Sequence, residues 1–494
     1  MVINIILAIL VLSIIIIIHE LGHFIVAKAN GITVVEFSLG FGPKLIHFKK
    51  GETEYSLKLL PFGGACIMLG EDFLEADDDE QEDATEGNNT GKAGSELDND
   101  FCNGKTAEDN GFGNTSRYSS DNTSAGSYMS EKKKQEALEA GYDMSKSFAN
   151  KSVWARIAVI AAGPIFNFIL AFVCSVVIIG SIGYDPCMVD VVYDNSPAVS
   201  AGLQEGDKII KVNNQKITFY RDYSFYRVYH ADDTMNITYE RDGQKYTTTL
   251  TPEYVKQQKY QMGVTLEQNG TIAGVSDGTP AQKAGIKKGD IITAVNGVAV
   301  DGSTKIIELV GQCNGESVDI TINRDGNTMQ LNVTPDSVEN EYYYTGFASY
   351  GARQKVSPIS VIGYAFKEVG YSVNTVVKSL GMMFTGQVGI NDLSGPVGTV
   401  SAMSNIVEES KADGTFYVIL NLLNLAGLIS ANLGVMNLLP IPALDGGRLV
   451  FLILEVLRGK PVKKEHEGMV HFVGMIFLFV LMIYVMFKDI RGLF

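Results

Sequence analysis

Four apolar stretches restrict how this 494-residue chain can fold more than any other feature of its sequence. They cover residues 2–18 (resuming at 24–27), 157–182, 416–439 and 469–487. A bilayer core needs about 20 apolar residues in an α-helix, and backbone polar groups inside it must be paired within the segment. We therefore predict a multi-pass membrane protein with four transmembrane helices.

The first stretch is interpreted as a retained helix and not as a signal peptide. No basic residue precedes its apolar run, and no small-residue cleavage site follows it. It ends in IIIIIHELGHF, which adds the ionisable side chains of His19, Glu20 and His23. Such groups are costly at membrane depth, so they usually face the interior of a helix bundle and serve a function there.

Basic residues near the helix ends predict the orientation of the chain in the membrane. They concentrate after the first stretch, before the second, and between the third and fourth: Lys28, Lys44, Lys49, Lys50, Lys132–Lys134, Lys146, Lys151 and Arg156, then Arg448, Arg458, Lys460, Lys463 and Lys464. We expect these segments to be cytoplasmic, with the N-terminus and residues 184–414 outside. Lys488 and Arg491, on the expected outer side, oppose this assignment weakly.

The formal charge of −16 comes largely from one segment. Residues 71–100 hold thirteen Asp and Glu and a single Lys, so the charge gives no indication of nucleic-acid binding. Residues 72–150 are poor in apolar side chains, which predicts an acidic, disordered cytoplasmic insert that acts as a solvated tether. The five cysteines are scattered without a C-x-x-C pair, which argues against a disulfide framework or a cysteine zinc site.

The segment expected outside the membrane repeats itself at a fixed offset of 83 residues. Residues 195–217 match residues 278–300, so that Asp207 aligns with Asp290 in a G-D-x-I motif. The pattern S/T-P-A, A-G-L/I and G-D-x-I resembles bacterial PDZ domains, which implies two tandem α+β modules on the outer face. By that resemblance they bind extended peptides at a sheet edge, and rigid spacers that limit access sterically are an equally weighted alternative.

Two further patterns lie outside the repeat. Residues 53–64, TEYSLKLLPFGG, alternate apolar and polar side chains and end in Pro and Gly, which predicts a strand or hairpin. Residues 358–384 carry apolar side chains every three or four positions. This spacing predicts an amphipathic helix on the outer membrane surface or against the modules, although ordinary core packing would produce the same pattern.

An H-E-x-x-H motif on a helix places two imidazoles on one face, where they can bind one metal ion. His19 and His23 are these imidazoles, and Glu20 lies beside them as a candidate general base. Zinc is the metal that this ligand type favours, and a catalytic zinc typically has three protein ligands. The weaker alternative is that these polar groups only form hydrogen bonds within a bundle.

Asp445, in NLLPIPALDGGR, is the favoured third ligand. The prolines before it break the helix, and the two glycines after it permit a close backbone approach. His466 and His471, at the start of the fourth stretch, are the alternatives.

Several motifs together resemble the site-2 protease family of intramembrane zinc metalloproteases, closest to its bacterial regulator-of-sigma-E protease branch. They are HELGH, AAGPIFNF at 161–168, the PDZ-like modules, SGPVG at 394–398 and GVMNLLPIPALDGG at 434–447. The resemblance implies that Zn²⁺ is bound by His19, His23 and Asp445, and that Glu20 is the general base and acid. It also implies that Asn437 and Asn167 contribute to substrate binding, and that residues 53–64 belong to a membrane-associated β-hairpin. The acidic insert departs from the family pattern.

The resulting prediction divides the chain into nine segments. They are a first transmembrane helix (1–28), a hairpin region (29–71), the insert (72–150), a second transmembrane helix (151–184), two PDZ-like modules (185–258 and 259–340), a linker with the amphipathic helix (341–414), a third transmembrane helix with the LDG motif (415–447), and a cytoplasmic loop with the fourth (448–494).

The predicted function is intramembrane zinc endopeptidase activity on single-span membrane proteins in a bacterial plasma membrane, with the active site toward the cytoplasm. By resemblance, the substrates would be anti-sigma factors or signal-peptide remnants. A catalytically inactive, membrane-anchored PDZ scaffold and a metal transporter are the alternatives. The intact H-E-x-x-H motif weighs against the scaffold, and the single ligand set weighs against the transporter.

Overall fold

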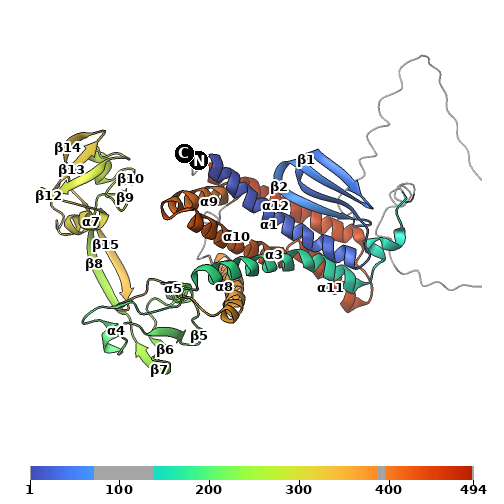
Figure 1. Ribbon diagram of the computed structural model, residues 1–494, viewed down its shortest axis with the longest axis horizontal. Helices are drawn as coiled ribbons and strands as arrows, with labels where there is room; N and C mark the ends of the chain where they lie inside the picture. The colour runs from blue at the N-terminus through green and yellow to red at the C-terminus, as the bar shows by residue number, and fades with distance from the viewer. Residues whose placement is uncertain (1, 72–137, 139–140, 387–388, 390–394, 492–494) are drawn as a thin grey trace, which may run out of the picture. The chain divides into compact units, whose positions relative to one another are not determined.

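The computed structural model describes residues 2–71, 138, 141–386, 389 and 395–491. These residues form two compact units, one of Met1–Gly183 with Lys355–Phe494 and one of Tyr184–Gln354 (Figure 1). Most of the predicted acidic insert lies outside the described residues, as does Ser394 of the SGPVG motif.

The first unit is built around four long apolar helices. They are α1 (Val2–Ala29), α3 (Val153–Ile182), α10 (Thr415–Leu438) and α12 (Lys464–Arg491). Among the described residues, these four are long and apolar enough to cross a membrane, which confirms the four predicted helices. Helix α3 packs against both α1 and α10 (Figure 1).

Glycines allow these helices to approach closely. A methyl group on Gly22 of α1 would lie 2.5 Å from the carbonyl oxygen of Ala162 in α3. A methyl group on Gly434 of α10 would lie 2.9 Å from the ring of Phe168, also in α3. Small residues at such positions are the usual means by which membrane helices pack backbone to backbone.

Helix α8 (Pro358–Phe384) coincides with the predicted amphipathic helix. One face packs on the membrane-spanning helices, where the rings of Phe366 and Phe172 lie 4.4 Å apart between centroids. Other apolar side chains of α8 remain exposed, including Ile359 and Ile362. Such a helix is suited to an apolar surrounding on its outer face.

Helix α9 (Pro396–Ser410) occupies part of the segment predicted as a linker. Its first turn has Pro at the N1 position, where the missing backbone N–H costs nothing. The buried carboxylate of Asp489, from α12, accepts hydrogen bonds from the backbone N–H groups of Gly395 and Gly398 at 2.9 and 2.8 Å. This contact stabilises the start of α9. It could not be predicted from the residues around α9, because Asp489 is distant in sequence.

Helix α11 (Asp445–Arg458) replaces the loop predicted after the third membrane helix. Glu455 of α11 accepts two hydrogen bonds, of 2.5 and 3.1 Å, from the guanidinium group of Arg156 in α3. Leu452 is buried in the same contact region. The helix is therefore stabilised by packing on α3, which the sequence pattern did not reveal.

A two-stranded antiparallel sheet follows α1. It consists of β1 (Val34–Lys50) and β2 (Thr53–Met68), and β2 includes the predicted strand at 53–64. Strand β2 runs beside α1, since a methyl group on Gly64 would lie 2.9 Å from Cγ of Glu20. The sheet is thus placed next to the helical turn that carries Glu20.

The second unit contains two copies of one module, each with a four-stranded sheet and two short helices. The first copy has β3 (Val191–Val192), α4 (Pro197–Ser200), β4 (Lys208–Val212), β5 (Gln215–Lys216), α5 (Tyr220–Tyr229), β6 (Met235–Arg241) and β7 (Gln244–Leu250). The second has β10 (Ile272–Val275), α6 (Pro280–Lys283), β11 (Ile291–Val295), β12 (Val298–Ala299), α7 (Ser303–Gly311), β13 (Val318–Arg324) and β14 (Asn327–Val333). The sheet orders, β5-β4-β6-β7 and β12-β11-β13-β14, are equivalent.

The same ion pair closes both modules. Arg241 donates to Asp207, with Nε 2.6 Å from Oδ1, and to the carbonyl of Gly202. Arg324 donates to Asp290 at 2.7 Å and to the carbonyl of Gly285, each residue 83 positions further on. The repeat therefore extends to tertiary contacts.

The second module is inserted into the first. The sequence instead predicted two modules one after the other, at 185–258 and 259–340. Strands β8 (Glu253–Gln261) and β15 (Asp336–Tyr344) pair as a ribbon that leads into and out of the second module. After the ribbon, β16 (Phe347–Ala348) pairs with β3 and completes the core of the first module. Its counterpart in the second module is β9 (Val264–Leu266), which pairs with β10.

The Asp290–Arg324 pair should make the stability of the second unit depend on pH. Hydrogen bonds from Arg324 and the backbone N–H of Lys287 lower the pKa of Asp290 below its usual range. A lowered pKa means that the carboxylate stabilises the fold above about pH 4, the pKa of an unfolded Asp, and that this stabilisation is lost as the pH falls through the folded value.

We expect Asp290→Asn to lower the melting temperature of the segment 184–354 at pH 7 by about 4–10 °C, because charged hydrogen bonds contribute about 1.5–3 kcal/mol. Thermal unfolding followed by circular dichroism checks this. The difference from the wild type should shrink below about pH 4. The same substitution at the exposed Asp301 is the control and should change little. Equal loss at both positions would contradict the assignment.

Candidate metal centre

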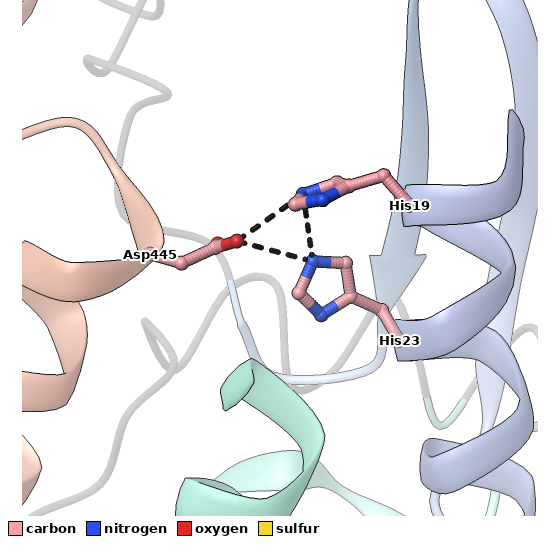
Figure 2. A group of neighbouring side chains, drawn as sticks. All are labelled: His19, His23 and Asp445. Carbon is pink, nitrogen blue, oxygen red and sulfur yellow. Dashed lines mark hydrogen bonds and ion pairs between the residues drawn. The ribbon is translucent and has the colours of Figure 1, made fainter. Parts of the chain in front are cut away.

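Two imidazoles lie one turn apart on α1, and a carboxylate from α11 reaches them. Nε2 of His19 lies 3.3 Å from Nε2 of His23, and both side chains are buried. Oδ2 of Asp445 lies 3.2 Å from the first of these nitrogens and 3.4 Å from the second. The structure thus brings together three potential metal ligands from opposite ends of the sequence (Figure 2).

These three distances fit a tetrahedral zinc site. Zinc binds imidazole nitrogen and carboxylate oxygen at about 2.0–2.2 Å, so neighbouring ligand atoms of a tetrahedron lie about 3.3–3.5 Å apart. The side chains of His19, His23 and Asp445 already have this spacing. Three protein ligands of this kind are also the set found in catalytic zinc sites, where one position remains for water or substrate.

Helix α3 supports the outer edges of both imidazoles. Nδ1 of His23 lies 2.9 Å from the carbonyl oxygen of Val159, which can only accept, so this nitrogen carries the proton and Nε2 presents its lone pair. Nδ1 of His19 lies 3.1 Å from the side-chain amide of Asn167. Metal-binding histidines usually donate their second ring N–H as His23 does to Val159.

Gly163 lies on the same face of α3, one turn from both Val159 and Asn167. A methyl group at this position would lie 2.3 Å from Nε2 of His23 and 2.8 Å from Cε1 of His19. Only glycine leaves room for the imidazoles here. Gly163 belongs to the AAGPIFNF motif at 161–168, but the sequence did not predict its steric role.

A tight break between α10 and α11 presents Asp445. Pro440 and Pro442 lie in this break, as the sequence predicted. A methyl group on Gly446 would lie 2.0 Å from the carbonyl oxygen of Leu439, so glycine is required for the turn. Asp445 therefore begins a helix and projects toward α1 (Figure 2).

The alternative third ligands occupy other positions. His471, on α12, accepts a hydrogen bond of 2.9 Å at Nδ1 from the backbone N–H of Ala443. Ala443 has a φ of 74°, which is strained for a residue other than glycine, so this contact supports the break before Asp445. His466 is exposed. Neither belongs to the ligand cluster found among the described residues.

The remaining predicted site residues surround this centre. Glu20 is close enough to interact electrostatically with His19, His23 and Asp445. The side-chain amide of Asn437, on α10, lies 3.4 Å from Nε2 of His19.

An ion pair between Arg448 of α11 and Glu71, which follows β2, joins the helix of Asp445 to the sheet beside Glu20. This ion pair was not predicted, because its partners are far apart in sequence. It gives the sheet and the helix that presents Asp445 a direct connection at the edge of the centre.

Long apolar helices that carry an H-E-x-x-H motif and a carboxylate as third ligand are the architecture of an integral membrane metallopeptidase, and the comparisons agree. The model of Peptidase family M50 matches residues 7–481, and the chain belongs to this family, the site-2 proteases. It is 31% identical over 511 residues to the zinc metalloprotease RasP of Bacillus licheniformis, with 98% of each chain covered. It is 30% identical to the regulator of sigma-W protease RasP of Bacillus subtilis, with 96% of this chain and 95% of that protein covered.

The protein is therefore a membrane zinc metalloprotease. Among solved structures, the HtrA3 PDZ domain bound to a phage-derived ligand is similar to part of this chain. The match covers 17% of this chain and 93% of the HtrA3 PDZ chain. The identity is 21% and the TM-score is 0.16.

The close approach of Gly163 to the imidazoles leads to a prediction. Gly163→Ala should weaken zinc binding and reduce proteolysis about 100-fold or more, since displacing a catalytic group by about 1 Å can cost that much. Zinc content of the purified protein and cleavage of a membrane substrate are the measurements. Gly180→Ala is the matched control, because it lies on the same helix with nothing within 4 Å of the added methyl. Full zinc content in Gly163→Ala would contradict the proposed packing.

Proposed function

We propose that this protein is an intramembrane endopeptidase whose zinc is held by His19, His23 and Asp445 and whose general base is Glu20. The observation that carries the proposal is the triangle of ligand atoms 3.2–3.4 Å apart, with Glu20 on the same helix as two of them. Three of these residues come from positions 19–23 of α1, and the fourth, Asp445, is the first residue of α11. Their convergence supports a hydrolytic site more directly than the motif alone.

Zinc bound there would polarise the scissile carbonyl and lower the pKa of water to about 7. The carboxylate of Glu20 takes a proton from the attacking water and later donates it to the nitrogen of the leaving amine. Asn437 is the residue we propose for hydrogen bonding to the substrate backbone near the scissile bond. Its amide lies next to His19, so a peptide held there would also be near Glu20.

A helical membrane substrate has to unwind before hydrolysis, because its peptide groups are already hydrogen bonded within the helix. We propose that the β1–β2 sheet is membrane-associated and that β2 receives the unwound segment in extended form. The close approach of Gly64 to Glu20 supports this role, since it places the strand beside the proposed general base. Backbone groups at a strand edge can pair with an extended peptide.

The proposed substrates are single-span membrane proteins, including anti-sigma factors and signal-peptide remnants. The name of the Bacillus subtilis relative, regulator of sigma-W protease, supports the first class. We further propose that the two modules are PDZ-like and lie outside the cell, where they bind or sterically select substrates that have already been shortened. Their shared topology and repeated ion pair support a common origin as modules.

Glu20→Gln should lower the cleavage of a tagged single-span substrate by about 10²–10⁴-fold, because it removes the proton acceptor and keeps the shape of the side chain. Zinc content should stay at the wild-type level, since Glu20 is not in the ligand triangle. Immunoblotting of the co-expressed substrate and metal analysis of the purified protein check the two parts. Glu308→Gln, an exposed change on α7, is the control. Cleavage that survives in Glu20→Gln would refute the mechanism.

The proposed orientation predicts which positions a membrane-impermeant maleimide can reach in intact cells. In a cysteine-free background, Asp301→Cys should be labelled directly, because the second module would be outside. Lys460→Cys, after α11, should be labelled only once the membrane is permeabilised, as positive-inside topology requires. Both positions are exposed, so their burial does not decide the result. The reverse pattern of labelling would invert the assignment.

A further inference from the structure

We propose that Asn167 is a positioning residue that fixes the tautomer of His19 and so directs its Nε2 toward the metal. This inference rests on the proposed function, because it assumes that His19 is a zinc ligand. It assigns Asn167 a different role from the substrate binding that the family resemblance implied. The contacts of the Asn167 side chain, on α3, carry the inference.

Asn167 is completely buried, and its amide is directed at the outer edge of the His19 ring. Nδ2 lies 3.1 Å from Nδ1 of His19, on the opposite side of the ring from the atoms that approach Asp445. Burying an amide inside a helix bundle is costly unless it forms hydrogen bonds. A contact with a single imidazole nitrogen at this distance indicates that the amide is placed for that nitrogen.

The chemistry of a metal-binding imidazole determines which amide atom should face it. If Nε2 of His19 binds zinc, Nδ1 carries the proton and needs an acceptor. The Oδ1 atom of Asn167 is buried and has no hydrogen-bond partner in the described part of the chain. Rotating the amide by about 180° exchanges two atoms of equal size and turns Oδ1 toward Nδ1–H. That orientation pairs Oδ1 of Asn167 with Nδ1–H of His19, and the amide N–H groups take the place that Oδ1 leaves.

The position of Asn167 is itself held from a third helix. Oγ of Ser430, on α10, donates a hydrogen bond of 2.8 Å to the backbone carbonyl of Asn167, and Ser430 is fully buried. The contacts therefore run from α10 through α3 to the ring of His19. His23 has a simpler arrangement, because its acceptor is the backbone carbonyl of Val159. His19 is thus the ligand whose tautomer depends on a replaceable side chain.

The test measures zinc affinity separately from proteolysis. The full-length protein carries Glu20→Gln, so that it cannot degrade itself, and is titrated in detergent micelles with a zinc chelator of known affinity. Adding Asn167→Leu, which keeps the size and removes the acceptor, should weaken zinc binding about 10–100-fold. Adding Asn167→Asp should keep the affinity at or above that of the parent, because a carboxylate accepts from Nδ1–H at least as well.

Asn4→Leu is the matched control. Asn4 is also a buried amide of a membrane-spanning helix, but it bonds to Glu408, in α9, and not to the metal centre. It should leave zinc affinity unchanged. Asn167→Ala provides a second variant without the acceptor in case the Leu side chain prevents folding, which circular dichroism of the helices would reveal.

The outcomes separate the inference from the function on which it rests. A Glu20→Gln parent that fails to bind one zinc per chain would overturn the zinc site itself. A parent that binds zinc, with Asn167→Leu or Asn167→Ala binding equally well, would overturn only the role of Asn167. Equal weakening by Asp and by Leu at this position would also overturn it, because it would indicate a space-filling role. Loss with Leu and retention with Asp supports the proposed hydrogen bond.

Discussion

The structure depends on the packing of α3 between α1 and α10, because this packing holds polar groups together in apolar surroundings. Two imidazoles and a carboxylate would be costly to bury separately at membrane depth. They converge because Gly22 and Gly163 let α1 and α3 approach closely and Gly434 does the same for α10. The two imidazole nitrogens and the carboxylate oxygen then lie 3.2–3.4 Å from one another. The ligand cluster therefore depends on the same close contacts that pack the helices together.

Features with a local signal could be predicted from the sequence. The four apolar stretches correspond to four helices, since length and composition decide whether a segment can cross a bilayer. The repeat at an offset of 83 residues corresponds to two modules with the same sheet order. Pro440 and Pro442 fall in the break between α10 and α11, because proline cannot continue a helix. The H-E-x-x-H spacing places His19 and His23 on one face of α1.

Features that depend on contacts between distant segments could not be predicted. The sequence favoured Asp445 over His466 and His471, but it did not show that His471 supports the turn before Asp445. Helix α11 has local end signals, with Asp445 in its first turn and Gly459 as its C-cap, but its packing on α3 through the Arg156–Glu455 pair joins residues far apart in sequence. Likewise, nothing around Gly163 indicates that its missing side chain makes room for a ligand on another helix. These contacts are properties of the assembled bundle.

The insertion of one outer module into the other restricts the order in which the polypeptide can acquire its structure during synthesis. The second module is continuous from Met262 to Val333, so it can fold as soon as that stretch has emerged. The first lacks β16 until Phe347 has been added, and before then β3 has no partner strand in the described residues. The second module can therefore complete its fold before the first, and a ribosome stalled between these points would leave β3 of the first module unpaired by β16.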